Sequence, residues 1–142
     1  MITLRRGFWY NESMKEAICA TLSFILSTIV FLLGGIDVAL QCLLVAIALD
    51  YVSGVIKAYT TKTLSSSIGF KGIVKKVGLL LLVMVSVLVD YVTGQTGAVR
   101  TLVIYYFVAN EGLSIIENLS IAGVPIPKGL KKALKALRKE NE

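Results

Sequence analysis

The stretch VALQCLLVAIALD, residues 38–50, is the part of the chain that decides its fold. It is apolar apart from Gln41 until it ends in Asp50. A carboxylate inside an apolar segment is costly in hydrocarbon, so it usually faces the interior of a helix bundle or a water-filled path. The segment KAYTTKTLSSSIGFKGIVKK, residues 57–76, follows with five lysines. An inward-facing acid followed by a basic anchor predicts a transmembrane helix that ends on the cytoplasmic side.

The composition of the whole chain agrees with a membrane protein. Its 142 residues are 56% hydrophobic and only 17% charged, whereas soluble domains are about 45–50% apolar and about 25% charged. A chain this short cannot bury so much apolar surface in one soluble core. We therefore predict an all-α integral membrane protein with a single membrane domain.

Four apolar segments are predicted to cross the membrane as short helices, at residues 17–33, 36–58, 77–92 and 101–119. Glycine-containing turns at 34–35 and 93–97 join them into two hairpins, and a basic connection, residues 60–76, links the hairpins. Residues 1–16 are predicted to be a cytoplasmic N-terminal segment, 17–119 the transmembrane domain, and 120–142 a basic cytoplasmic tail.

The tail carries its own helical pattern, because Leu130, Leu134 and Leu137 repeat at i, i+4 and i+7 with lysines between them. This pattern is typical of a basic amphipathic helix that lies on a membrane surface; the alternative is a solvated tail with some helical bias. Basic residues near anionic headgroups contribute about 1 kcal/mol each. The residues expected at the membrane surface are Lys71, Lys75, Lys76, Lys131, Lys132, Lys135, Arg138 and Lys139.

The positions of the basic residues predict the topology. The N-terminal flank has three, the middle connection together with Lys57 at the end of the second span has five, and the tail has six, which leaves only Arg100 elsewhere. Cytoplasmic loops carry an excess of lysine and arginine, and four spans place all three basic regions on one side. We therefore expect both termini in the cytoplasm.

Chemistry-bearing motifs of enzymes are missing from the sequence. It has no histidine, no CxxC pair and no phosphate-cradling glycine loop, and Cys19 and Cys42 both lie in apolar segments. We expect no enzymatic activity, no cofactor, no metal site and no nucleic-acid partner.

The candidate functional residues are polar groups within the predicted spans: Asp50, Gly54, Asp90, Asn110, Glu111 and Ser114. They allow two hypotheses: an oligomer whose polar faces line a pore, or a small transporter or ion channel that uses Asp50, Asp90 and Glu111. Purely structural roles are the alternative, with Asp50 bonded to a neighbouring helix and Asp90 paired with Arg100. Asp50 and Glu111 are expected at similar depth, since their helices run in the same direction.

Several segments resemble the toxin-secretion/phage-lysis holins. They are LDYVSGVIKA (49–58), KTLSSSIGFKGIVKK (62–76), RTLVIYYFVANEGLSIIENL (100–119) and GVPIPKGLK (123–131), and the resemblance covers roughly residues 35–139. It implies a homo-oligomer in the cytoplasmic membrane of a bacterial host cell, in contact with lipids. The implied activity is to open lesions that release an endolysin, or a toxin without a signal sequence, with no stable binding to it. The family is often drawn with three spans, whereas the charge count predicts four.

The predicted topology can be tested with single cysteines at Thr3, Ser66 and Asn141, in a background that lacks Cys19 and Cys42. All three should resist a membrane-impermeant thiol reagent in intact cells, because all three lie on the cytoplasmic side. Labelling at Ser66 with protection of both termini would contradict the four-span arrangement.

Overall fold

The computed structural model describes residues 3–139, and all its regular elements there are helices. It divides into two units, Met1–Gly35 and Ile36–Glu142. The side chains of residues 3–11, of Ile68 and of several residues in the last helix lie outside the description; this set includes the predicted surface residues Lys131, Lys135, Arg138 and Lys139.

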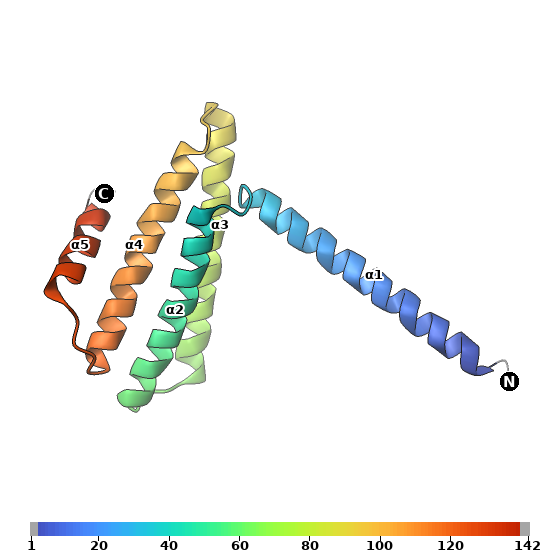
Figure 1. Cartoon of the computed structure of the whole chain (residues 1–142), viewed down its shortest axis with the longest axis horizontal. Helices are drawn as coiled ribbons and strands as arrows, with labels where there is room; N and C mark the ends of the chain where they lie inside the picture. The colour runs from blue at the N-terminus through green and yellow to red at the C-terminus, as the bar shows by residue number, and fades with distance from the viewer. Residues whose placement is uncertain (1–2, 140–142) are drawn as a thin grey trace. The chain divides into compact units, whose positions relative to one another are not determined.

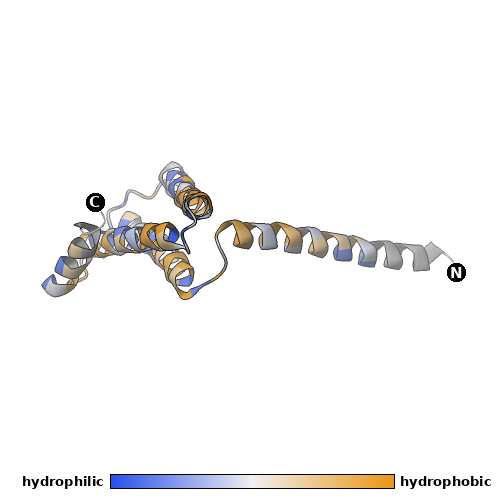
Figure 2. Ribbon diagram, turned by 90° about the horizontal axis from the view of Figure 1, so that it is seen from above, coloured by the Kyte–Doolittle hydropathy of each residue, from blue (hydrophilic) through white to orange (hydrophobic). Residues whose placement is uncertain are grey.

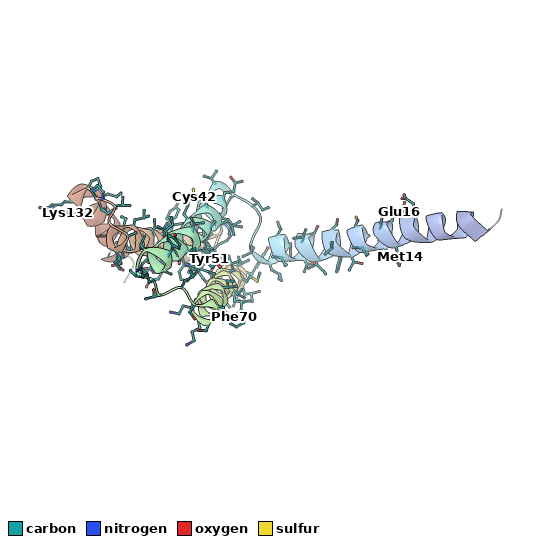
Figure 3. The ribbon with its side chains drawn as sticks, turned by 90° about the horizontal axis from the view of Figure 1, so that it is seen from below. Met14, Glu16, Cys42, Tyr51, Phe70 and Lys132 are labelled. Atoms are coloured by element: carbon teal, nitrogen blue, oxygen red, sulfur yellow. The ribbon has the colours of Figure 1, made fainter. Side chains whose placement is uncertain are left out.

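The first unit is a single long helix, α1 (Thr3–Leu32) (Figure 1). Helix extends through the polar segment from Thr3 onward, so α1 begins before the predicted membrane span, which starts at residue 17. Figure 2 shows apolar residues along much of its length, and Figure 3 shows Met14 and Glu16 projecting from different sides. The hydroxyls of Thr21 and Thr28 donate to backbone carbonyls one turn back, which satisfies these polar groups within an apolar helix.

The second unit is built around α4 (Ala98–Ile121), which packs against α2 (Val38–Thr60), α3 (Ser66–Thr93) and α5 (Lys128–Lys139). The helices α2 and α3 are consecutive in the chain but contact each other much less than either contacts α4. The chain turns back after α4, so α5 lies beside it (Figure 1). Lys132 points outward from α5, and Phe70 from α3 (Figure 3).

The basic connection between the hairpins is shorter than the sequence pattern predicts. Only residues 61–65 lie between α2 and α3, and Ser66 already begins α3. The second half of the predicted connection, which includes Lys71, Lys75 and Lys76, is therefore helical. This extension places Lys76 well inside a helix instead of at its start.

Asp37 and two glycines set the helix ends on the opposite side of this unit. Asp37 caps α2, and its carboxylate accepts a hydrogen bond from the backbone N–H of Leu40 at 2.9 Å. Gly94 ends α3 with φ 68°, and Gly97 precedes α4 with φ 87°. Both angles lie in the left-handed region that glycine adopts without strain, so the turn between α3 and α4 can be as short as four residues.

Buried apolar side chains form a stripe on each of α2, α3 and α4. They include Leu40 and Leu43 on α2, Leu79, Val83 and Val87 on α3, and Ile104, Leu113 and Ile116 on α4. Many other large apolar side chains are exposed, among them Val38, Leu88 and Val92. Outward-facing apolar surface of this extent is expected of helices that contact lipid.

Four of the described helices are long and apolar enough to cross a membrane, at Glu12–Leu32, Val38–Thr60, Gly69–Thr93 and Ala98–Ile121. The prediction of an all-α membrane protein with four transmembrane helices is therefore confirmed. The C-terminal helix is also present, as α5. Its position at a membrane surface stays a prediction.

Candidate functional site

One cluster of charged side chains joins the three central helices of the second unit. The ammonium of Lys76 on α3 donates to Asp50 Oδ2 on α2 at 2.5 Å, and it also binds Glu111 Oε2 on α4. The exposed fraction of the side chain is only 12% for Asp50, 17% for Lys76 and 10% for Glu111. One lysine therefore bridges two acids that the sequence places 61 residues apart, on separate helices.

Two polar residues complete this arrangement. The amide of Asn118 on α4 donates to Asp50 Oδ1 at 3.2 Å and to Ser53 Oγ at 3.1 Å. The hydroxyl of Ser53 donates to the backbone carbonyl of Asp50 at 2.9 Å. We call Asp50, Ser53, Lys76, Glu111 and Asn118 the inner cluster.

The acids of the inner cluster lie in the middle of their helices. Asp50 is twelve steps after Val38 and Glu111 thirteen steps after Ala98, which corresponds to roughly 18 and 20 Å along helices about 35 Å long. Both positions fall inside candidate membrane spans. Since α2 and α4 meet Lys76 from the same depth, the expected similarity in depth of Asp50 and Glu111 agrees with the structure.

A second group of charges, the terminal cluster, lies where α2 begins and α3 turns into α4. It consists of Asp37, Asp90 and Arg100. Asp90 accepts hydrogen bonds from the backbone N–H groups of Val99 at 3.0 Å and Arg100 at 2.8 Å. The Arg100 guanidinium donates to both carboxylate oxygens of Asp37, at 2.6 and 3.2 Å.

Asp90 acts as the cap of a helix to which it does not belong. The residue at the N-cap of α4 is Gly97, which has no side chain to accept a hydrogen bond. The first N–H groups of a helix have no partner within the helix, and the helix dipole favours an anion there. The carboxylate from α3 supplies both the acceptors and the charge.

The interaction with Arg100 changes the acidity of Asp37. The hydrogen bond from the Arg100 guanidinium, together with the one from the Leu40 backbone N–H, lowers the pKa of Asp37 below its ordinary value. Since the Asp37 side chain is 51% exposed, water screens this interaction strongly. Its main effect is to orient the start of α2 against α4.

The two clusters are separated by an apolar layer. Asp37 to Asp50 on α2 is thirteen steps, and Lys76 to Asp90 on α3 is fourteen, or roughly 20 Å. The buried side chains between them include Leu40, Leu43, Val83 and Ile104. Among the described residues of this unit, contacts between polar side chains of different helices therefore occur at two levels, one near the helix ends and one within the span.

The structure brings together some of the predicted site residues and separates others. Asp50 and Glu111 meet in the inner cluster, and Gly54 lies beside it, since a Cβ at Gly54 would be 3.7 Å from Asn118 Nδ2. Asp90 belongs to the terminal cluster instead. Asn110 and Ser114 are half-buried on α4, and their role in a pore stays a prediction.

Sequence reasoning did not select three residues that matter here. Lys76 was expected at the membrane surface with Lys71 and Lys75, but its ammonium lies between two carboxylates. Ser53 and Asn118 were not selected either, although helical spacing offers a signal. Ser53 follows Asp50 by three positions and Asn118 follows Glu111 by seven, so each shares a helix face with a buried acid.

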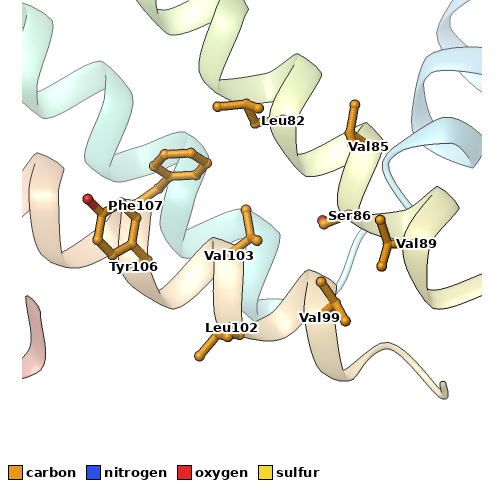
Figure 4. A pocket seen from close by; sticks show the side chains of 9 residues that line it. All are labelled: Leu82, Val85, Ser86, Val89, Val99, Leu102, Val103, Tyr106 and Phe107. Atoms are coloured by element: carbon orange, nitrogen blue, oxygen red, sulfur yellow. The ribbon is translucent and has the colours of Figure 1, made fainter. Parts of the chain in front are cut away.

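An apolar groove runs between α3 and α4, with a volume of about 370 Å³ (Figure 4). The groove wall includes one buried polar residue, Ser86. The Ser86 hydroxyl donates a hydrogen bond to the backbone carbonyl of Val83 at 2.6 Å. The groove therefore presents hydrocarbon surface. Its lining residues are Leu82, Val85, Ser86, Val89, Val99, Leu102, Val103, Tyr106 and Phe107.

Within the described part of the chain, no group of three or more His, Cys, Asp or Glu side chains could hold a metal ion. The inner cluster instead offers two carboxylates, an ammonium and an amide inside a membrane span. Such groups can bind protons, can link neighbouring helices through polar contacts, and can line a water-filled path.

Comparison with known proteins identifies the class of this membrane protein. The model of the bacteriophage holin family matches residues 27–139, which include all of α2, α3, α4 and α5 but only the end of α1. The chain belongs to the bacteriophage holin family and is a holin-like membrane protein.

Curated relatives agree with this assignment. An uncharacterised 14.9 kDa protein from the nagH 3′ region of Clostridium perfringens is 46% identical over 75% of this chain and 82% of its own length. A probable holin of Bacillus phage phi105 is 35% identical over 72% of this chain and 76% of its own. The YqxH protein of Bacillus subtilis is 36% identical over 80% of both chains. No solved structure matches the chain.

The capping role of Asp90 can be tested by substitution. Asp90→Ala should lower the free energy of unfolding by about 1–3 kcal/mol, since it leaves N–H groups at the start of α4 without an acceptor. Asp90→Asn retains an acceptor oxygen and should lose less. Denaturant titrations in detergent micelles, followed by helical circular dichroism, measure both. An Asp90→Ala protein as stable as the wild type would show that Asp90 does not cap α4.

The interaction between Asp37 and Arg100 predicts a pH dependence of stability. A carboxyl group whose pKa is lower in the folded state stabilises the fold above its unfolded pKa, roughly 3.9, and this contribution disappears as the pH falls through the folded pKa. Arg100→Gln should raise the pKa of Asp37 and weaken this acid dependence. Carboxyl carbon NMR titration of Asp37 measures the shift. An unchanged pKa in Arg100→Gln would contradict the assignment of Arg100 as its main cause.

Proposed function

We propose that this chain is a pore former that assembles in the cytoplasmic membrane of a bacterial host cell and permeabilises it. The lesion would release an endolysin, or a toxin without a signal sequence, and thereby lead to host cell lysis. Membership of the bacteriophage holin family supports this proposal, and so does the similarity to the probable holin of Bacillus phage phi105.

The observation that carries the proposal is the inner cluster. A holin must remain harmless as single subunits in lipid and then present polar surface to water. In this chain, lipid contacts the apolar exterior, while Asp50, Lys76 and Glu111 lie inside the bundle of α2, α3 and α4. A rearrangement that parts these helices would expose a ring of polar groups in every subunit of an assembly.

The topology proposed for this function places both termini in the cytoplasm. The region that matches the family covers three candidate spans, and α1 adds a fourth before it. With four spans, the N-terminal arginines, the basic connection and the basic tail all lie on the cytoplasmic side of the membrane. The proposed partners are further copies of the chain and membrane lipids; the hydrolase or toxin would pass through without stable binding.

A second candidate function is a small transporter or an ion channel that uses Asp50, Asp90 and Glu111. The contact of Asp50 and Glu111 with one lysine favours it, because acid–base groups within a span are typical of proton and ion pathways. Asp90 does not contribute to the inner cluster, as its carboxylate accepts hydrogen bonds from the start of α4.

A size series of dyes in liposomes distinguishes these two functions. The purified full-length chain is reconstituted into vesicles loaded with small dyes and with labelled dextrans of increasing mass. A holin should release dextrans as large as an endolysin above a threshold protein-to-lipid ratio, since lesions need many subunits. Release of protons or small ions alone, at every ratio, would contradict the holin proposal and support the channel.

Substitutions of Asp50 test whether the inner cluster takes part in lesion formation. Asp50→Asn keeps the size of the side chain but removes its charge, and it should shift the onset of lysis without loss of membrane insertion. Asp50→Leu should delay lysis and reduce cross-linked oligomers, because it removes an insertion cost of about 2.5–3.5 kcal/mol and so stabilises the dispersed subunit.

The matched control is Gln41→Leu, which replaces an exposed polar residue on the same helix, outside the inner cluster. It should leave lysis onset unchanged at equal expression. If Asp50→Leu also gives lysis and oligomers like those of the wild type, the pore-lining residues must lie on another face.

A further inference from the structure

The inner cluster has an excess of acid over base. It contains two carboxyl groups, Asp50 and Glu111, and one ammonium, Lys76. If all three groups are ionised, the cluster carries one negative charge within a membrane span. An uncompensated ion in an apolar medium costs several kcal/mol even after relaxation and water penetration.

The terminal cluster has the same numbers of acidic and basic groups but compensates its charge in two other ways. Asp90 lies at the N-terminus of α4, where two backbone N–H groups and the helix dipole offset a negative charge. Asp37 is 51% exposed, so water solvates it. The inner cluster has neither advantage, because Asp50 and Glu111 lie in mid-helix and are nearly buried.

The other charged groups around the inner cluster leave its excess charge in place. On α2, Lys57 comes seven residues after Asp50, roughly 10 Å along the helix. Lys75 on α3 and Glu117 on α4 are exposed. On α5, which packs against α4, the described lysines Lys128 and Lys132 are exposed as well. The carboxylates contact Lys76 and Asn118, and Asn118 is neutral.

We propose that the inner cluster is a binding site for one proton, which the carboxyl groups of Asp50 and Glu111 hold between them beside Lys76. The ligand is a proton taken from water, and it adds to a carboxylate oxygen without breaking any covalent bond of the chain. With the proton bound, one acid is neutral, the other pairs with Lys76, and the cluster carries no net charge.

The proton site has a consequence for the opening of the pore, and this consequence rests on the proposed pore function. When the helices part and water reaches the cluster, the acids ionise and the proton passes to water. The closed state then binds one proton more per subunit than the open state. Because a rise in pH favours the state with fewer protons, alkaline pH should promote opening, by up to tenfold per pH unit for each subunit.

Infrared spectroscopy detects the bound proton without any pore assay. A protonated carboxyl group has a carbonyl stretching band that a carboxylate lacks. The full-length protein would be measured at pH 7 in vesicles of ether-linked lipid, which has no ester carbonyl, at a protein density too low for lesions. The wild type should show a band equivalent to one protonated carboxyl per chain.

Three substitutions make the expected count specific. Asp50→Asn and Glu111→Gln each leave one acid to pair with Lys76, so each should remove the band. Lys76→Met leaves two acids without a base and should double it. The matched control is Glu117→Gln, the same change on the same helix at an exposed position, and it should leave the band unchanged.

A wild-type protein without the band at pH 7 would overturn the proposal, and so would a band that survives both Asp50→Asn and Glu111→Gln. If Lys76→Met fails to insert, the two isosteric substitutions still decide the result. The dextran assay tests the proposed function separately from the proton site. If the infrared band follows the expected count but no dextran is released at any pH, the proposed holin function is contradicted and the proton site is established.

Discussion

The contact of one ammonium with two carboxylates is the interaction on which the central bundle depends. In lipid, apolar side chains gain little by leaving the acyl chains for one another, so packing and polar contacts must hold helices together. Lys76, Asp50 and Glu111 come from α3, α2 and α4, and no two of them share a helix. Loss of Lys76 would leave both acids without their base, and removing one partner of a buried ion pair typically costs 3–5 kcal/mol. The same contact that holds the helices together also hides their charges from the lipid.

Hydropathy was sufficient to predict four long apolar helices, because it depends on positions within one segment. The role of Lys76 could not be predicted in the same way. Its neighbour Lys75 and the basic residues before it indicate a headgroup-facing segment, and the helix was expected to begin only at residue 77. Since α3 begins at Ser66, Lys76 shares the buried face with Leu79 and Val83 instead. That face is determined by which helices pack beside α3, and a single sequence does not record this.

The pairing of Asp90 with Arg100 shows a similar limit. Their proximity across the turn was predictable, but the form of the contact was not. Asp90 accepts from the backbone N–H of Arg100, because the N-cap residue Gly97 has no side chain and leaves the start of α4 without an acceptor. The guanidinium is then available to Asp37 on α2. Local patterns reveal which groups need partners, whereas the three-dimensional arrangement decides which partners they find.

The placement of α4 between α2 and α3 has a consequence for how the chain is made. The ribosome delivers α2 first, and the Asn118 amide that binds Asp50 follows 68 residues later, roughly 3–14 s at the usual speed of synthesis. Lys76 follows Asp50 by only 26 residues. In the interval Lys76 has already left the ribosome, as have the four lysines between it and Asp50, so Asp50 has basic partners before α4 is made. Asp50 can therefore pair with Lys76 before Glu111 and Asn118 are made, and Lys76 lies between two acids only after α4 has joined the bundle.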